Sequence, residues 1–255
     1  MRRLFAALAT LPLLCAPAAA ESLTIALSTS DIRIDSDFSG DVITIFGVIE
    51  RDAATVSRGS PYDIAVLVRG PTEAVVARRK EPLLFLWVNR SSETFTAAPS
   101  YYALSSTRPL DEIATPPTLK RFGLGFDNVP LQVADPAEEA TDPEFRDAFI
   151  RLRKQAGLYS EFAGGVDFIG TSNAVFRSAA WIPSNAPDGR YTVEVFLFAG
   201  EAFLSHRQAT LNVTKVGFEQ FMFEASHNNA LLYGLACVLL ALFTGWLAGV
   251  IFRRD

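Results

Sequence analysis

The chain has 255 residues, of which 49% are hydrophobic, and a net charge of −5 at pH 7. Without its first 20 and last three residues it holds 19 basic and 27 acidic side chains, a charge near −8. This acidic balance argues against nucleic acid and anionic lipid as main partners. The two cysteines, Cys15 and Cys237, lie in the terminal apolar segments described below, so the region between them has no disulfide.

Residues 1–20 have the pattern of a secretory signal peptide. Two arginines precede an apolar stretch from Leu4 to Leu14, and small residues follow up to Ala20. The apolar stretch has about half of the roughly 20 residues that a membrane span needs. We therefore expect cleavage after Ala20, with an uncleaved anchor as the alternative. Lipid attachment at Cys15 is disfavoured, because a leucine precedes it where a small residue is expected.

Between residues 21 and 215, short apolar runs alternate with turn residues, which predicts a β-rich domain. The Gly70-Pro71 turn predicts that the strands on either side of it pair as a hairpin. The last three runs are expected to form a three-stranded meander. The predicted strands are LTIAL, DVITIFGVIE, YDIAVLVRG, EAVVARR and LLFLWVN, followed by AVFRSAAWIP, RYTVEVFLF and AFLSHRQATLNV.

The final strands carry alternating apolar residues between proline and glycine turns, as in the closing strands of immunoglobulin-like sandwiches. The expected inward face consists of Tyr191, Val193, Val195 and Leu197. The predicted fold class is therefore mainly β, an immunoglobulin-like β-sandwich. Whether the strands form one sandwich or two smaller β domains stays open.

A helical segment is predicted to interrupt the strands at about residues 108–160. Thr141 and Glu144 have capping-box spacing, and Phe145, Ala148, Phe149 and Leu152 follow at helical spacing up to Gly157. A shorter helix is expected to start at Pro116.

Residues 230–252 form an uncharged apolar segment of 23 residues, long enough to cross a bilayer as a helix. Arginines follow it directly, whereas the juxtamembrane segment 216–229 holds no Lys or Arg. Because positive residues stay inside, residues 253–255 are expected in the cytoplasm and the domain 21–215 outside it. A buried helix of a soluble domain is the disfavoured alternative.

The segment 230–252 carries small residues at Ala241, Gly245 and Gly249, on one helix face. Such a face lets another helix approach closely, although the same spacing also occurs in passive anchors.

One basic cluster, Arg78, Arg79 and Lys80, is a candidate anion-binding site, because arginine forks match sulfate-like or phosphate oxygens. A charged strand edge explains the cluster equally well. The segment beginning at Asp35 resembles the start of a calcium loop, but Phe46 stands where the closing glutamate is required, so a turn is preferred. His206 and His227 stand outside any zinc motif, and we expect no enzyme activity, metal or cofactor.

Several stretches resemble an alphaproteobacterial transmembrane protein family, Alph_Pro_TM. The resemblance implies membrane location and carries over no catalytic residue. It also implies a permease of the sulfite-exporter type as a candidate partner, because such permeases are encoded beside members of this family. The stretches are IRIDSDFSGDVITIFGVIE, VLVRGP, RRKEPLLFLWVN, PSYYALSSTRPL, FRDAFIRLRKQAGLY, VFRSAAWIPSNAPDGRYTVEVFLF, KVGFEQFMFEASHNNALLYGLACVLLALFTGW and FRR.

The expected function is a membrane-anchored periplasmic accessory or interaction protein, associated with such a permease or with itself. The alternative is an anchored periplasmic domain that binds a small anion, and an envelope enzyme is the third candidate. The expected location is the inner (cytoplasmic) membrane, crossed once, with the main domain in the periplasm. The expected partners are the lipid bilayer, through one helix, and a membrane protein; nucleic acid is not among them.

Overall fold

The computed structural model describes residues 21–35, 39–50, 61–83, 85–134, 143–170, 173–216, 226–227 and 230–251. The predicted signal peptide, most of the juxtamembrane segment, and the tail 253–255 lie outside these ranges. So do Thr141 of the predicted capping box and the centre of the loop that follows Asp35.

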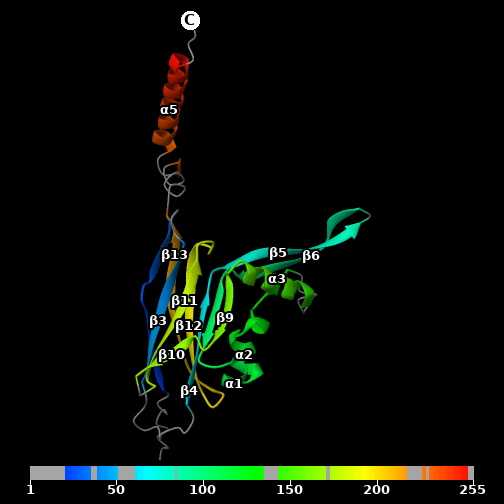
Figure 1. Ribbon diagram of the computed structural model, residues 1–255, viewed down its shortest axis with the longest axis vertical. Helices are drawn as coiled ribbons and strands as arrows, with labels where there is room; N and C mark the ends of the chain where they lie inside the picture. Colours follow the sequence, from blue (N-terminus) through cyan, green and yellow to red (C-terminus); the bar gives the residue numbers. More distant parts are fainter. Residues whose placement is uncertain are drawn as a thin grey trace, which may run out of the picture.

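Two sheets face each other and form a sandwich (Figure 1). In spatial order the first contains β1 (Ser22–Leu27), β3 (Gly40–Glu50), β11 (Val175–Pro183) and β10 (Val166–Ile169). The second contains β2 (Asp31–Ile34), β13 (Ala202–Lys215), β12 (Gly189–Ala199), β4 (Tyr62–Arg69), β7 (Tyr102–Ser106) and β9 (Tyr159–Ala163).

This arrangement matches the two sheets of an immunoglobulin fold with added edge strands. The sheet β1-β3-β11-β10 corresponds to strands A, B, E and D, and β13, β12 and β4 correspond to G, F and C. Tyr191 at the start of β12 donates a hydrogen bond of 2.6 Å to the carbonyl oxygen of Pro187, which is the tyrosine corner of such domains. The predicted fold class is confirmed, and the strands form one sandwich.

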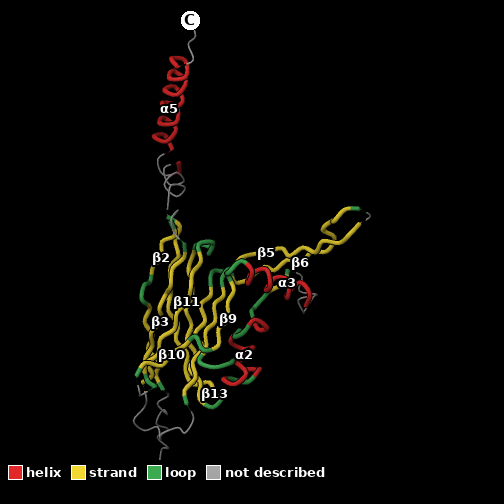
Figure 2. The backbone as a smooth tube through the Cα atoms, viewed as in Figure 1, coloured by secondary structure: helices red, strands yellow, loops and turns green. Residues whose placement is uncertain are grey.

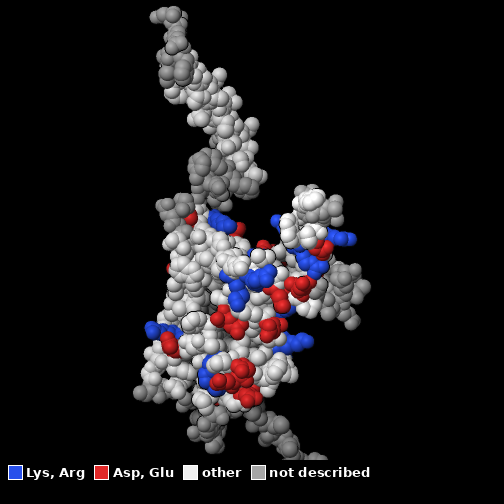
Figure 3. All heavy atoms as spheres, turned by 45° about the vertical axis from the view of Figure 1, so that its right-hand side comes forward, with Lys and Arg blue, Asp and Glu red and all other residues white. Residues whose placement is uncertain are grey.

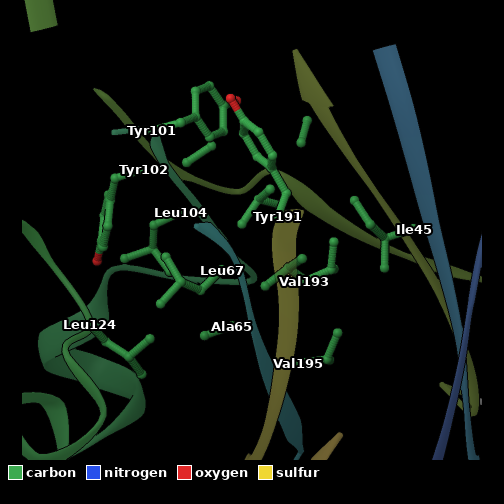
Figure 4. Close-up of a cluster of buried hydrophobic side chains, with 14 of the residues drawn as sticks. Ile45, Ala65, Leu67, Tyr101, Tyr102, Leu104, Leu124, Tyr191, Val193 and Val195 are labelled. Atoms are coloured by element: carbon green, nitrogen blue, oxygen red, sulfur yellow. The ribbon is translucent and has the colours of Figure 1, made fainter. Parts of the chain in front are cut away.

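The central strands of the second sheet, β4 and β12, are buried on both faces (Figure 4). Tyr191, Val193 and Val195 are buried, as the sequence pattern predicts. Val193 and Val195 lie on the side of β12 toward Ile45 of the facing sheet, and the ring of Tyr191 packs on that of Tyr101 with centroids 5.6 Å apart. On the opposite face, Leu67 of β4 lies among apolar side chains of the helical insertion and β7. Every residue from Asp63 to Val68 is therefore buried, and the simple alternation expected of a half-exposed strand is absent there.

The helical insertion supplies this second cover (Figure 2). It lies between β7 and β9, and because it crosses over, β9 pairs with β7 in parallel. Pro116 begins its second helix, as predicted, and Gly157 ends its last one with a φ of 72° that favours glycine. The insertion contains α1 (Leu110–Ile113), α2 (Pro116–Phe122), η1 (Phe126–Asn128), β8 (Gln132–Val133) and α3 (Pro143–Gln155).

The predicted hairpin at Gly70-Pro71 is wrong. β4 pairs with β12 and β7, whereas the following strand, β5 (Thr72–Leu83), pairs with β6 (Leu86–Pro99). Backbone hydrogen bonds from Gly70 to Tyr101 and from Ser100 to Pro71, each 2.9 Å, continue one ladder into the other. Gly70-Pro71 is therefore a bend within one long hairpin, where the chain leaves the sandwich for a separate sheet of order β5-β6-β8.

The predicted three-stranded meander is correct for its last two strands only. β12 and β13 pair antiparallel, but β11 pairs with β3 and β10 in the opposite sheet. The turn at residues 184–188 crosses between sheets, which places apolar faces of β11 and β12 on opposite sides of one core.

Candidate functional sites

The most prominent feature outside the sandwich is the two-stranded arm formed by β5 and β6 (Figure 1). It extends the β4–β7 pair, and the 12 residues of β5 correspond to a length of about 40 Å. Pro71, at its base, lies beside Gly189, which pairs with Val213 near the end of β13. The arm therefore leaves the sandwich at the end from which the chain continues to the apolar helix α5 (Ala230–Ile251).

Helix α3 braces the lower half of the arm. Phe149 is buried, and its ring centroid lies 5.3 Å from that of Phe95 on β6 and 5.9 Å from that of Tyr159 on β9. Ion pairs join Arg153 to Glu73 and Arg79 to Glu144, so both ends of the helix are tied to β5. Ring packing and paired charges together hold the arm in one direction relative to the sandwich.

The end of the arm is apolar and uncovered. Phe85 is 98% exposed and Trp87 is 70% exposed. Trp87 and Val88 are successive strand residues, so their apolar side chains lie on opposite faces of the arm. The sequence predicted LLFLWVN as one strand of the domain, but Leu83 ends β5, Phe85 lies in the turn of the arm, and β6 begins at Leu86.

Arg78, Arg79 and Lys80 lie on β5, but they do not converge. Successive strand residues alternate, which separates Arg79 from its two neighbours. Arg79 faces α3 and is paired with Glu144 and with Glu81, whose oxygen lies 3.0 Å away. Hydrogen bonds from Ser91 and Arg79 lower the pKa of the Glu81 carboxyl. The arrangement resembles a charged strand more than a pocket for an anion.

Basic side chains converge instead in a pocket of about 500 Å³ on the outer face of the second sheet. Glu194 is buried there between two partners: Arg69 is ion-paired with it, and His206 Nε2 lies 3.3 Å from its Oε1 atom. His206 stacks on Phe196 with a centroid distance of 4.6 Å. The charged and imidazole side chains that line the pocket are Arg69, Lys120, Arg121, Asp127, Arg146, Glu194 and His206.

Two of these cations also have structural roles. Arg146 Nη2 donates to the carbonyl oxygens of Phe126, Asp127 and Val129 at 3.1, 2.9 and 2.9 Å, which shapes the rim of the pocket. Arg69 neutralises Glu194. The exposed cations Lys120 and Arg121, on α2, are thus the side chains best placed to meet a negatively charged ligand.

Helix α5 is long and apolar enough to cross a membrane, and none of its length is buried within the chain. Space is open around Gly245 and Gly249, one and two helical turns beyond Ala241. This face is available to a neighbouring helix. Across the ranges that the structure describes, no set of three His, Cys, Asp or Glu side chains could hold a metal ion.

Sequence reasoning missed both the exposed end of the arm and the pocket. The pocket gathers residues from β4, β12, β13, α2 and α3, which are far apart in the chain, and no linear motif marks it. The sequence does hold a signal for the arm: six apolar residues, Leu83 to Val88, lie between the charged residues Glu81 and Arg90. Such a run is typical of a buried strand, whereas the pairing of β5 with β6 leaves Phe85 and Trp87 exposed.

Comparisons with known proteins give a family match and several distant structural likenesses, including an adhesin domain and a fimbrial subunit. The N-terminal domain of the Streptococcus gordonii adhesin Sgo0707 is 7% identical with a TM-score of 0.29; 75% of this chain and 32% of that one are covered. AggA, the major subunit of aggregative adherence fimbriae type I from Escherichia coli, is 10% identical with a TM-score of 0.26; 78% of this chain and 96% of that one are covered. This chain thus spans about a third of the adhesin domain.

No curated protein matches the sequence. The family described as "Putative transmembrane protein (Alph_Pro_TM)" matches residues 22–254, which is nearly the whole chain after the predicted signal peptide. The resemblance found in the sequence is confirmed, and the chain belongs to the Alph_Pro_TM family of transmembrane proteins.

Proposed function

We propose that the chain is a periplasmic accessory module of the inner membrane, anchored by α5, which associates with an integral membrane partner. A permease of the sulfite-exporter type is the partner to test first, because the family resemblance implies one. The observation that carries the proposal is the architecture: one apolar helix with an open small-residue face is joined to a sandwich that bears a braced, uncovered arm.

Association through α5 is tested by replacing Gly245 and Gly249 together with leucine. Glycine allows helix backbones to approach closely, so the bulkier side chains should separate the helices while leaving membrane insertion intact. Helix contacts in lipid are worth about 1 kcal/mol each, so we expect a several-fold loss of crosslinking to the permease or to a second copy. Ala236→Leu, about 140° away around the helix from Ala241, is the matched control.

The proposal requires that wild type and the Ala236→Leu control crosslink equally at equal membrane abundance. If the double variant also crosslinks as they do, the small-residue face is a passive surface. If wild type captures neither the permease nor itself, the accessory role is contradicted.

A second function, binding of a small anion, is favoured by the pocket beside α2. Replacing Lys120 and Arg121 with glutamine should weaken binding of sulfate or sulfite by the full chain, measured by titration calorimetry. Replacing Arg78 and Lys80 with glutamine is the matched control, because it removes the same charge from the arm. If only the control lost binding, the anion site would be assigned to Arg78 and Lys80 on the arm. If wild type bound no sulfate or sulfite, this function would be excluded.

A further inference from the structure

The exposed apolar end of the arm lacks any cover among the residues that the structure describes. Phe85 is 98% exposed and Trp87 is 70% exposed, whereas Phe95, further down β6, is fully buried. An exposed cluster of large apolar side chains on a soluble domain marks a surface that meets another molecule or a membrane.

The position of the arm favours a membrane. Its base lies at the end of the sandwich where β13 finishes, through the contact of Pro71 with Gly189 and the pairing of Gly189 with Val213. The chain continues from Val216 to α5, which begins at Ala230. Figure 1 shows the arm rising from this end toward the side of the molecule on which α5 lies. A bilayer crossed by α5 is therefore within reach of an arm of about 40 Å.

The charges of the arm fit a lipid surface. From Arg78 to Arg90 the chain carries four basic residues and one acidic residue, whereas the domain as a whole is acidic. Figure 3 shows Lys and Arg side chains around the uncharged end of the arm. Basic residues next to an apolar segment are attracted by anionic head groups, and tryptophan prefers the boundary between head groups and acyl chains.

The shape of the arm favours lipid over a protein partner. A protein that docks on a two-stranded ribbon covers one of its faces, whereas a fluid bilayer surrounds an inserted end. Apolar side chains occur on both faces, with Trp87 and Val88 as successive strand residues. Bracing by α3 keeps the arm extended, which reduces the ordering cost of insertion.

From these observations we propose that the end of the arm is a second membrane contact, which inserts Phe85 and Trp87 into the interface of the bilayer that α5 spans. The inference rests on the anchoring in the proposed function, but it does not depend on a permease partner. Two attachments, α5 and the arm, then fix the orientation of the sandwich above the membrane. Without the arm, the sandwich would have one membrane attachment, α5, among the residues that the structure describes.

The test places the full chain in lipid nanodiscs of phosphatidylethanolamine and phosphatidylglycerol with one tryptophan as the reporter. Trp181→Phe with Trp246→Phe leaves Trp87 as the only tryptophan. A matched control adds Trp87→Phe and Phe162→Trp, because Phe162, on β9, has a similar exposure of 65%. Emission is recorded with lipids brominated on the acyl chains and with acrylamide, which quenches from the water.

We expect the emission of Trp87 to be shifted to the blue, quenched several-fold more by brominated lipid than the control, and shielded from acrylamide. Phe85→Ser should reduce the quenching by brominated lipid, and so should glutamine at Arg78, Lys80 and Arg90. Circular dichroism of each variant verifies that the sandwich is folded.

Equal quenching of Trp87 and of the control by brominated lipid would overturn the inference. Shielding that requires two chains per nanodisc would assign the arm to a second copy, and shielding found only in native membranes would assign it to another protein. Both results would contradict a lipid contact. Neither would affect crosslinking through α5, so failure of this inference and failure of the proposed function are distinguishable.

Discussion

The hydroxyl group of Tyr191 joins the start of β12 to the turn that precedes it. Its 2.6 Å hydrogen bond to Pro187 is shielded from water, because Tyr191 is fully buried. Tyr191→Phe keeps the ring and removes the bond, so we expect the free energy of unfolding to fall by about 1 kcal/mol. Calorimetry of the full chain should show a Tm lower by about 2–4 °C. Trp87→Phe, which alters an exposed ring, should leave the Tm unchanged, and an equal change in both variants would contradict this account.

Glu81 is the titratable residue that couples the arm to pH. Its pKa lies below the usual 4.5, because Ser91 donates to the carboxylate at 2.8 Å and Arg79 donates at 3.0 Å. A carboxyl group with a lowered pKa stabilises the folded arm above pH 4.5, and this contribution is lost as the pH falls through the folded value. The hydrogen-exchange protection factors of β5 and β6 should therefore fall below pH 4.5 in wild type. In Glu81→Gln this fall should be absent, and its persistence would assign the pH effect to another group.

At the scale of elements, α3 determines how firmly the arm is held. Phe149→Ala empties a site shared with Phe95 and Tyr159, and we expect a loss of about 3–5 kcal/mol in the free energy of unfolding. Leu152→Ala on the same helix is the control, because Leu152 is 60% exposed. Its cost should stay within about 0.5 kcal/mol, as is usual for surface positions. Denaturant unfolding of the two variants separates these outcomes, and equal losses would show that α3 is not a brace.

The same helix shows how far local patterns predict structure. The helical spacing correctly predicts α3, but it also places Leu152 on the buried face of the helix. Helical periodicity gives the position of a residue around an axis, whereas the breadth of the covered face depends on what packs there. Among the described residues, β5, β6 and β9 cover Phe149, whereas Leu152 is 60% exposed.

The local sequence likewise predicts where strands lie, but it does not predict which strands pair. Gly70-Pro71 predicts that the chain changes direction. The same two residues are compatible with a hairpin turn and with a bend between two sheets. The choice depends on Tyr101 and Ser100, about 30 residues away, whose backbone groups bond to Gly70 and Pro71. The interpretation of Arg78, Arg79 and Lys80 as one site could have been refined from the sequence, because alternation along a strand already separates adjacent residues.

At the scale of the whole molecule, the fold class and the membrane helix could be predicted from the sequence, because turn spacing, inward-facing alternation and apolar length are all readable without contacts. The family followed from the resemblance of several stretches to its members, and the family match over residues 22–254 confirms it. The pocket and the extension of the arm away from the sandwich could not be predicted from the sequence, because both depend on tertiary packing. Together the fold, the family and the apolar helix support our proposal that a periplasmic immunoglobulin-like domain is held on the inner membrane by a single span.

Labelling of a single cysteine tests that claim most directly. Cys237→Ser removes the cysteine of the span, and Ser160→Cys adds one at an exposed position on β9. Because the predicted cleavage after Ala20 would also remove Cys15, we expect the mature chain of this variant to have one thiol. A maleimide that does not cross membranes should label it in intact spheroplasts, on a protein that begins at Glu21. Labelling only after the inner membrane is broken would place the domain in the cytoplasm and contradict the account.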